Sequence, residues 1–110
     1  MPIKQVFTYT MPDGTPGPTV EQWAEGLSAE DKQKFEDSKA RQLASRQSLV
    51  EAGHLEVVGQ SMPNKQPDYV FADRAAIDKK IEETDPEWLV FWNRYLEETG
   101  VQFTIKEEEI

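Results

Sequence analysis

The chain has 110 residues, no cysteine, and a formal net charge of −9 from 21 acidic and 12 basic residues. This length fits a single domain over residues 1–110. The lack of cysteine excludes disulfides, cysteine-ligated zinc and thiol nucleophiles, and the acidic balance argues against nucleic acid as a partner. No apolar run approaches the roughly 20 residues of a membrane span, so we expect no membrane partner. No signal peptide is evident, so we expect a cytoplasmic location or assembly into a particle inside a cell.

The first half of the chain predicts a strand followed by two helices. Ile3–Thr10 alternates as a strand does, with Ile3, Phe7 and Tyr9 on one face. Prolines and glycines then make Met11–Pro18 a rigid loop, which is either a connector or a preorganised contact element.

Two capping signals open the predicted helices. Thr19 and Gln22 form a capping box before a short helix, and Ser28 caps a longer helix that we expect to run to about Ala52. Gly53 supplies its stop signal. The apolar face of the longer helix is predicted to consist of Ala40, Leu43, Ala44 and Val50.

The second half predicts a hairpin, two helices and a final strand. We expect strands at 55–62 and 69–72, joined by a turn at 63–68. Helices are expected at 74–83, capped by Asp73, and at 88–98, opened by Asp85-Pro86-Glu87 and closed by Gly100. Val101–Lys106 alternates as a strand, and residues 107–110 are expected to fray as an acidic tail.

The resulting order, β-αα-β-β-αα-β, predicts an α+β fold of the ferredoxin-like type. Right-handed crossovers would place the helices on one face of a four-stranded antiparallel sheet. The other face would then be solvated or covered by a partner.

The segment Tyr69–Lys106 resembles the second half of dimeric α+β barrel proteins, a superfamily that includes antibiotic-biosynthesis-type and heme-degrading monooxygenases. The resemblance rests on a short strand, on Asp73-Arg74-Ala75-Ala76 opening a helix, on Asp85-Pro86-Glu87-Trp88 opening an aromatic helix, and on the closing strand. It implies a homodimer whose sheets pack face to face, and a ligand pocket between each sheet and its helices. The chain departs from the heme-degrading members, because Trp92 and Asn93 are adjacent and the sole histidine is His54.

The aromatic helix is the most informative feature of the sequence, since apolar side chains cover most of its circumference. We expect part of it to contact a partner chain, a lid or a ligand, with simple core packing as the alternative. The candidate residues for an interface or a pocket are Trp88, Phe91, Trp92 and Tyr95 on the helix, and Phe7, Tyr9 and Phe103 on the strands.

Polar residues give weaker signals for chemistry. His54 is a candidate general base because its unperturbed pKa lies near neutral, although its place after Gly53 also suits a structural histidine near a helix end. Glu82, Glu83, Asp85 and Glu87 are close enough in sequence to gather a hard cation, but solvation and helix capping explain them as well. We predict no catalytic motif, no metal site and no cofactor.

These observations favour a non-catalytic protein–protein interaction or assembly component that forms a homo-oligomer or binds another protein. Its composition resembles that of phage and mobile-element accessory proteins. Two alternatives stay open: a cofactor-independent, monooxygenase-like enzyme acting on a small ligand, and an acidic mimic of nucleic acid. A pocket lined by Phe7, Tyr9, Trp88, Trp92 and Phe103, with one buried polar group, would favour the enzyme.

Overall fold

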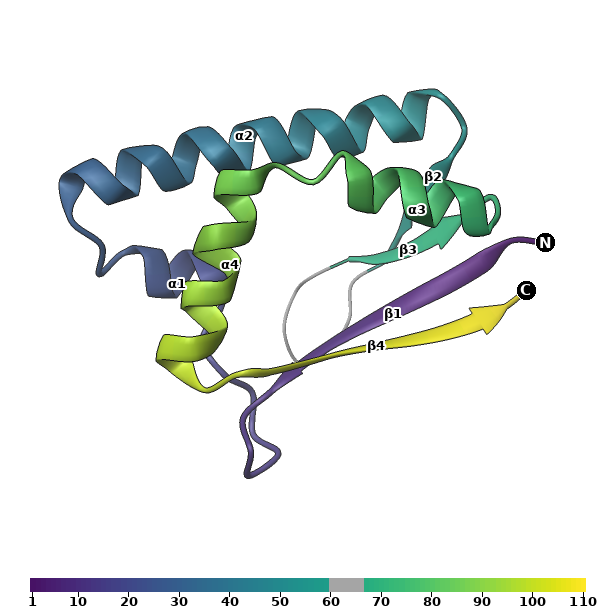
Figure 1. Ribbon diagram of the computed structural model, residues 1–110. Helices are drawn as coiled ribbons and strands as arrows, with labels where there is room; N and C mark the ends of the chain where they lie inside the picture. The colour runs from purple at the N-terminus through teal and green to yellow at the C-terminus, as the bar shows by residue number, and fades with distance from the viewer. Residues whose placement is uncertain (60–66) are drawn as a thin grey trace.

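Four antiparallel strands form one sheet in a computed structural model that describes residues 1–59 and 67–110 (Figure 1). The strand order is β2-β3-β1-β4, so the first strand of the chain lies in the interior of the sheet, between β3 and β4. The strands are β1 (Ile3–Thr10), β2 (Leu55–Val58), β3 (Asp68–Phe71) and β4 (Gln102–Glu109).

Within the described residues, four helices cover one face of this sheet (Figure 1). They are α1 (Val20–Ala24), α2 (Ala29–Glu51), α3 (Arg74–Glu82) and α4 (Pro86–Thr99). The element order confirms the predicted α+β, ferredoxin-like arrangement, with two helices in each crossover.

Every predicted N-cap is confirmed. A side-chain oxygen accepts a backbone N–H two or three residues into the helix at each of Thr19, Ser28, Asp73 and Asp85. Gly100 ends α4 in the left-handed conformation with φ of 75°, which glycine adopts without steric cost. The caps therefore define the helix starts close to where the sequence placed them.

Two of the strands have boundaries that differ from the prediction. Strand β2 ends at Val58, and β3 begins at Asp68 and ends at Phe71. Residues 60–62 of the predicted second strand and 63–66 of the predicted turn lie outside the described residues.

Strand β1 is the centre of the core, because alternate side chains along it are buried against the helices. The buried set divides into two clusters. The first cluster contains Phe7, Tyr9, Val20, Ala24, Phe35, Phe91, Tyr95 and Val101. The second cluster contains Ile3, Leu49, Leu55, Phe71, Ala76 and Ile77.

Val50 packs against the second cluster as predicted, but the other three residues of the predicted apolar face do not form the buried face of α2. Its buried residues are Phe35, Ser38 and Leu49, whereas Leu43 is 42% exposed and Ala40 and Ala44 are also exposed. Phe35 lies in the first cluster and Leu49 in the second, so α2 spans both. Between them the inner face is polar, because it lies against the junction of α3 and α4 rather than against apolar side chains.

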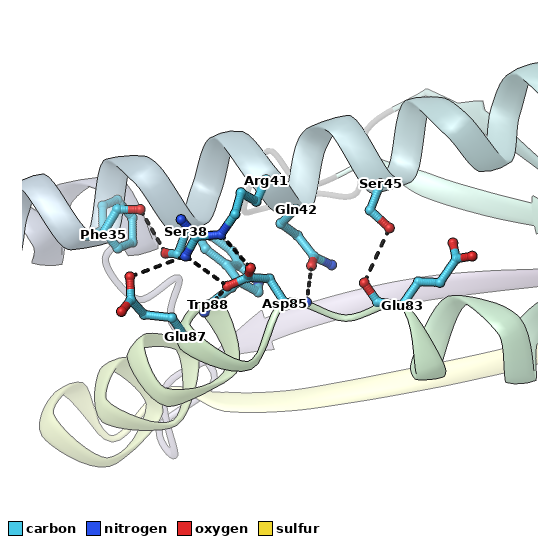
Figure 2. A network of polar contacts seen from close by, with 9 residues as sticks. All are labelled: Phe35, Ser38, Arg41, Gln42, Ser45, Glu83, Asp85, Glu87 and Trp88. Atoms are coloured by element: carbon cyan, nitrogen blue, oxygen red, sulfur yellow. Dashed lines mark hydrogen bonds and ion pairs between the residues drawn. The ribbon is translucent and has the colours of Figure 1, made fainter.

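Hydrogen bonds and an ion pair hold that junction to α2 (Figure 2). The side-chain oxygen of Gln42 accepts the backbone N–H of Asp85 at 2.9 Å. Arg41 Nε donates to Asp85 Oδ2 at 2.6 Å, and Ser45 Oγ donates to the carbonyl of Glu83 at 3.3 Å. These contacts fix where α4 begins and thus how its aromatic side chains face the sheet.

The carboxyl-terminal residues also differ from the expectation of a frayed acidic tail. Strand β4 continues to Glu109, which lies opposite Ile3 of β1. The carboxylate of Glu107 accepts hydrogen bonds from Gln5 at 3.0 Å and from Arg74 Nη2 at 2.7 Å. Strand β4 therefore extends beyond the alternating segment Val101–Lys106, because it pairs with the whole length of β1 and because Arg74 balances the charge of Glu107.

Candidate functional site

A cavity of about 280 Å³ lies between the sheet and the helices; we call it the central cavity. Tyr69 lines it and packs against both core clusters, so the cavity lies where the two clusters meet. The described lining comes from three strands and all four helices: Tyr9, Glu21, Lys39, Gln42, Leu43, Arg46, Tyr69, Lys80, Thr84, Trp88, Leu89, Trp92 and Phe103.

One wall of the central cavity is aromatic. Tyr9 and Phe103 lie opposite each other in the β1–β4 register, with ring centroids 5.0 Å apart. Trp92 meets both rings edge-on, at 5.4 Å from Tyr9 and 5.6 Å from Phe103. Trp88 lies one turn earlier on α4 and stacks on Trp92 at 6.3 Å. This wall offers faces and edges of aromatic rings, which favour contact with a planar apolar group.

Two cationic side chains lie beside Tyr69, which forms another part of the cavity lining. Arg46 Nη1 donates to the Tyr69 hydroxyl at 3.3 Å. Lys80 Nζ lies 5.7 Å from the centroid of the same ring, in cation–π range. Burial lowers the pKa of Lys80, and the positive charge of Arg46 lowers it further. Within residues 1–59 and 67–110, neither cation forms an ion pair.

The third cation of the lining is neutralised. Lys39 Nζ lies 3.5 Å from a carboxylate oxygen of Glu21, which also lines the cavity. Nearby, burial raises the pKa of Tyr9, and Tyr69 is the next contributor to that rise. The Tyr9 hydroxyl therefore stays protonated in the neutral range and provides an uncharged hydrogen-bonding group.

The structure brings four of the seven aromatic candidates together at the cavity: Tyr9, Trp88, Trp92 and Phe103. The other three, Phe7, Phe91 and Tyr95, are buried in the first core cluster. Phe7 lies 5.0 Å from Tyr69 and 5.9 Å from Phe103, so it supports two of the lining rings. Tyr95 donates its hydroxyl to the carbonyl of Pro18, which connects α4 to the end of the Met11–Pro18 loop.

His54, the candidate general base, is not among the described residues that line the cavity. Its backbone N–H donates to the carbonyl of Leu49, and its own carbonyl accepts the N–H of Ala72. These bonds connect the end of α2 to the end of β3, which is a structural role for the backbone at this position.

The predicted carboxylate group is divided among different partners. Asp85 and Glu87 both contact Arg41, and Glu83 lies 3.7 Å from Lys79. Among the residues that the structure describes, no three His, Asp or Glu side chains are placed to hold a metal ion.

Sequence reasoning missed Tyr69, Arg46 and Lys80 as site residues. Arg46 belongs to a run of mixed charge that is typical of a solvated helix face. One signal was present, because Lys39, Leu43 and Arg46 follow each other at helical spacing and therefore share one face of α2. That this face meets Lys80 of α3 is a property of the tertiary structure.

Comparison of the chain with protein-family models, with curated proteins and with solved structures finds no match. The fold and the geometry of the central cavity are therefore the basis for assigning a function. In the described part of the chain, none of the helices combines the length and the hydropathy needed to cross a bilayer.

Proposed function

We propose that the central cavity binds a small organic molecule with a planar, apolar body. The observation that carries this proposal is an open volume of about 280 Å³ between the sheet and the helices. The cavity is open to solvent, since Leu43 and Leu89 of its lining are 42% and 47% exposed, so a ligand can enter it. An engineered apolar cavity of about 150 Å³ binds benzene, so the central cavity has room for a fused bicyclic ring.

The character of the lining supports the same proposal. Ligand pockets are lined mainly by apolar and aromatic side chains, with a few polar groups that orient the ligand. Among the described residues, five aromatic side chains line the central cavity together with Leu43 and Leu89, and cations and phenol hydroxyls supply the polar groups. The hydroxyl of Thr84 is already used, because it donates to the carbonyl of Lys80 at 3.1 Å.

A naphthalene probe tests the proposal. 2-Naphthoate and the neutral 2-naphthalenemethanol would each be added to the isotopically labelled protein, with binding followed by ligand-observed saturation transfer and by the indole N–H signals of Trp88 and Trp92. We expect at least one probe to bind and to shift both indole signals.

A cavity-filling variant and a matched control make the result specific. Leu43→Trp adds volume at the cavity and is expected to abolish binding. Ile81→Trp is the control, because Ile81 is 66% exposed on α3 and is not part of the described lining. Absence of binding by both probes, or equal binding to Leu43→Trp and the unmodified chain, would contradict the proposal.

A second candidate function is self-association, favoured by two exposed apolar side chains on α4. Leu89 is 47% and Val90 57% exposed. On the outer sheet face β1 presents Lys4, Val6, Thr8 and Thr10, all half-buried, so Leu89 and Val90 are the more exposed apolar side chains. Light scattering over a dilution series tests the idea: a dimer that Val90→Asp dissociates would support it, and a monomer at all concentrations would exclude it.

A further inference from the structure

The two cations beside Tyr69 repel each other in the free protein. Arg46 bonds to the Tyr69 hydroxyl and Lys80 lies over its ring, so a single side chain brings both charges to one region. Arg46 disfavours the protonated form of Lys80. An anion placed between them would remove this repulsion, so the arrangement binds an anion more strongly than separate surface cations would.

The acidic residue of the described cavity lining, Glu21, and the acidic residue that acts on Lys80, Glu83, are both paired with other lysines. Glu21 is paired with Lys39 at 3.5 Å, and Glu83, which favours the charged form of Lys80, is paired with Lys79 at 3.7 Å. The chain carries 21 acidic residues against 12 basic ones. Despite this excess of acidic residues, the two partly buried cations form no ion pair within the described part of the chain. Their arrangement therefore suits a counter-ion supplied by a ligand.

Arg46 keeps most of its hydrogen-bonding capacity. A guanidinium has five N–H donors in a rigid plane, and in the described structure Arg46 uses one of them, toward Tyr69. The remaining donors match the two oxygens of a planar carboxylate. A monoanion fits better than a dianion such as phosphate, because the net charge of −9 repels a dianion more strongly.

We propose that the ligand of the central cavity is a planar aromatic carboxylate, whose acid group binds between Arg46 and Lys80 and whose ring lies against Trp88 and Trp92. This inference rests on the proposed function and names the chemical class of its ligand. The aromatic wall supplies the apolar contact, and the pair of cations distinguishes an acid from a neutral molecule of the same shape.

The two naphthalene probes test the inference, since they share a ring system and differ in charge. We expect 2-naphthoate to bind roughly tenfold or more tightly than 2-naphthalenemethanol, which is the effect of one charge-assisted hydrogen bond. Arg46→Gln and Lys80→Gln are each expected to weaken binding of the acid several-fold and to leave the affinity for the alcohol unchanged. Lys32→Gln, an exposed lysine of α2 outside the described lining, is the control and is expected to change neither.

The outcomes separate the two proposals. If neither probe binds, the proposed function fails. If the alcohol binds as tightly as the acid, the cavity binds ligands but the carboxylate assignment is wrong. The same conclusion follows if Arg46→Gln and Lys80→Gln weaken the binding of both probes equally. If inorganic phosphate competes with 2-naphthoate at equal concentration, the preference for a monoanion is also wrong. If Arg46→Gln does not fold, which loss of its dispersed amide signals would show, the same comparison is made with Lys80→Gln alone.

Discussion

Arg46 of α2 donates a hydrogen bond to the hydroxyl of Tyr69 of β3 across 3.3 Å. The ring of Tyr69 packs against both core clusters, and Lys80 of α3 lies over it. One tyrosine thus connects two helices and the sheet beside the central cavity. Its ring and its hydroxyl have separate roles, which substitutions can distinguish.

Tyr69→Phe removes the hydroxyl and keeps the ring. We expect the free energy of unfolding to fall by about 1 kcal/mol, the usual net value of a hydrogen bond. Tyr69→Ala removes the ring as well, and we expect a loss of roughly 3 kcal/mol from lost packing. Urea unfolding followed by tryptophan fluorescence measures both. Equal losses in the two variants would show that the ring contributes little.

Binding of 2-naphthoate is expected to weaken as the pH rises toward the alkaline range. The pKa of Lys80 lies below its usual value because of burial and the charge of Arg46, while Glu83 opposes this shift. Lys80 therefore loses its proton, and its attraction for the acid, at a lower pH than an exposed lysine would.

Calorimetric titration at several pH values checks this dependence. The alcohol probe is the internal control, and its affinity is expected to stay constant over the same range. In Lys80→Gln the affinity for 2-naphthoate is expected to stay constant from neutral pH up to the range in which tyrosines ionise, roughly pH 10. A dependence that persists unchanged in this variant would assign the titration to another group.

Asp85 stabilises the start of α4 in a manner that depends on pH. Its carboxylate accepts the N–H of Trp88 at 3.0 Å, and the hydrogen bond from Arg41 is the main reason that its pKa is lowered. A carboxyl group with a lowered pKa stabilises the fold above its unfolded pKa of about 3.9. That contribution is lost as the pH falls through the folded value.

We expect Asp85→Ala to cost about 1 kcal/mol at neutral pH, as the loss of an N-cap does. Asp85→Asn keeps a capping oxygen and is expected to cost less. The difference in stability between the unmodified chain and Asp85→Asn is expected to shrink as the pH is lowered from about 5 to about 2. A difference that stays constant over this range would show that the charge of Asp85 is not responsible.

Gly17 is required for close packing between the proline-glycine loop and the sheet. A methyl group at this position would lie 2.5 Å from Cγ2 of Val101, which is 5% exposed. We expect Gly17→Ala to destabilise the fold by about 1–3 kcal/mol, the usual cost of overpacking. Gly26→Ala is the matched control, because its added methyl would meet its nearest neighbour at an ordinary 3.6 Å.

A double-mutant cycle identifies the cause. Val101→Ala removes the clashing methyl group, so Gly17→Ala is expected to cost much less in that background. Additive effects of the two substitutions, measured by thermal unfolding, would exclude a clash between these residues.

The sequence alone determined the order of the elements and the ends of most helices. Thr19, Ser28, Asp73 and Asp85 were recognisable as caps because each acts on backbone groups two or three residues away. Alternation along Ile3–Thr10 likewise predicted the buried face of β1 correctly. Such features depend on neighbouring residues, and their physical causes can be read in a short window of sequence.

The tertiary structure decided which face of α2 is buried and how far β4 extends. Gln42 and Ser45 can face inward because Asp85 and Glu83, some forty residues away, supply their hydrogen-bonding partners. Glu107 continues a strand because Gln5 and Arg74 bind its carboxylate. A polar side chain is buried or exposed according to whether a distant segment satisfies it.

The aromatic part of the central cavity was foreseen in its components, since Tyr9, Trp88, Trp92 and Phe103 were candidates from the outset and all line it. The charged part was not, because Arg46 and Lys80 are ordinary cations in sequence. They acquire a common location only when α2, α3 and β3 pack together around Tyr69. Local chemistry determines where elements begin and end, whereas a binding site depends on which elements meet.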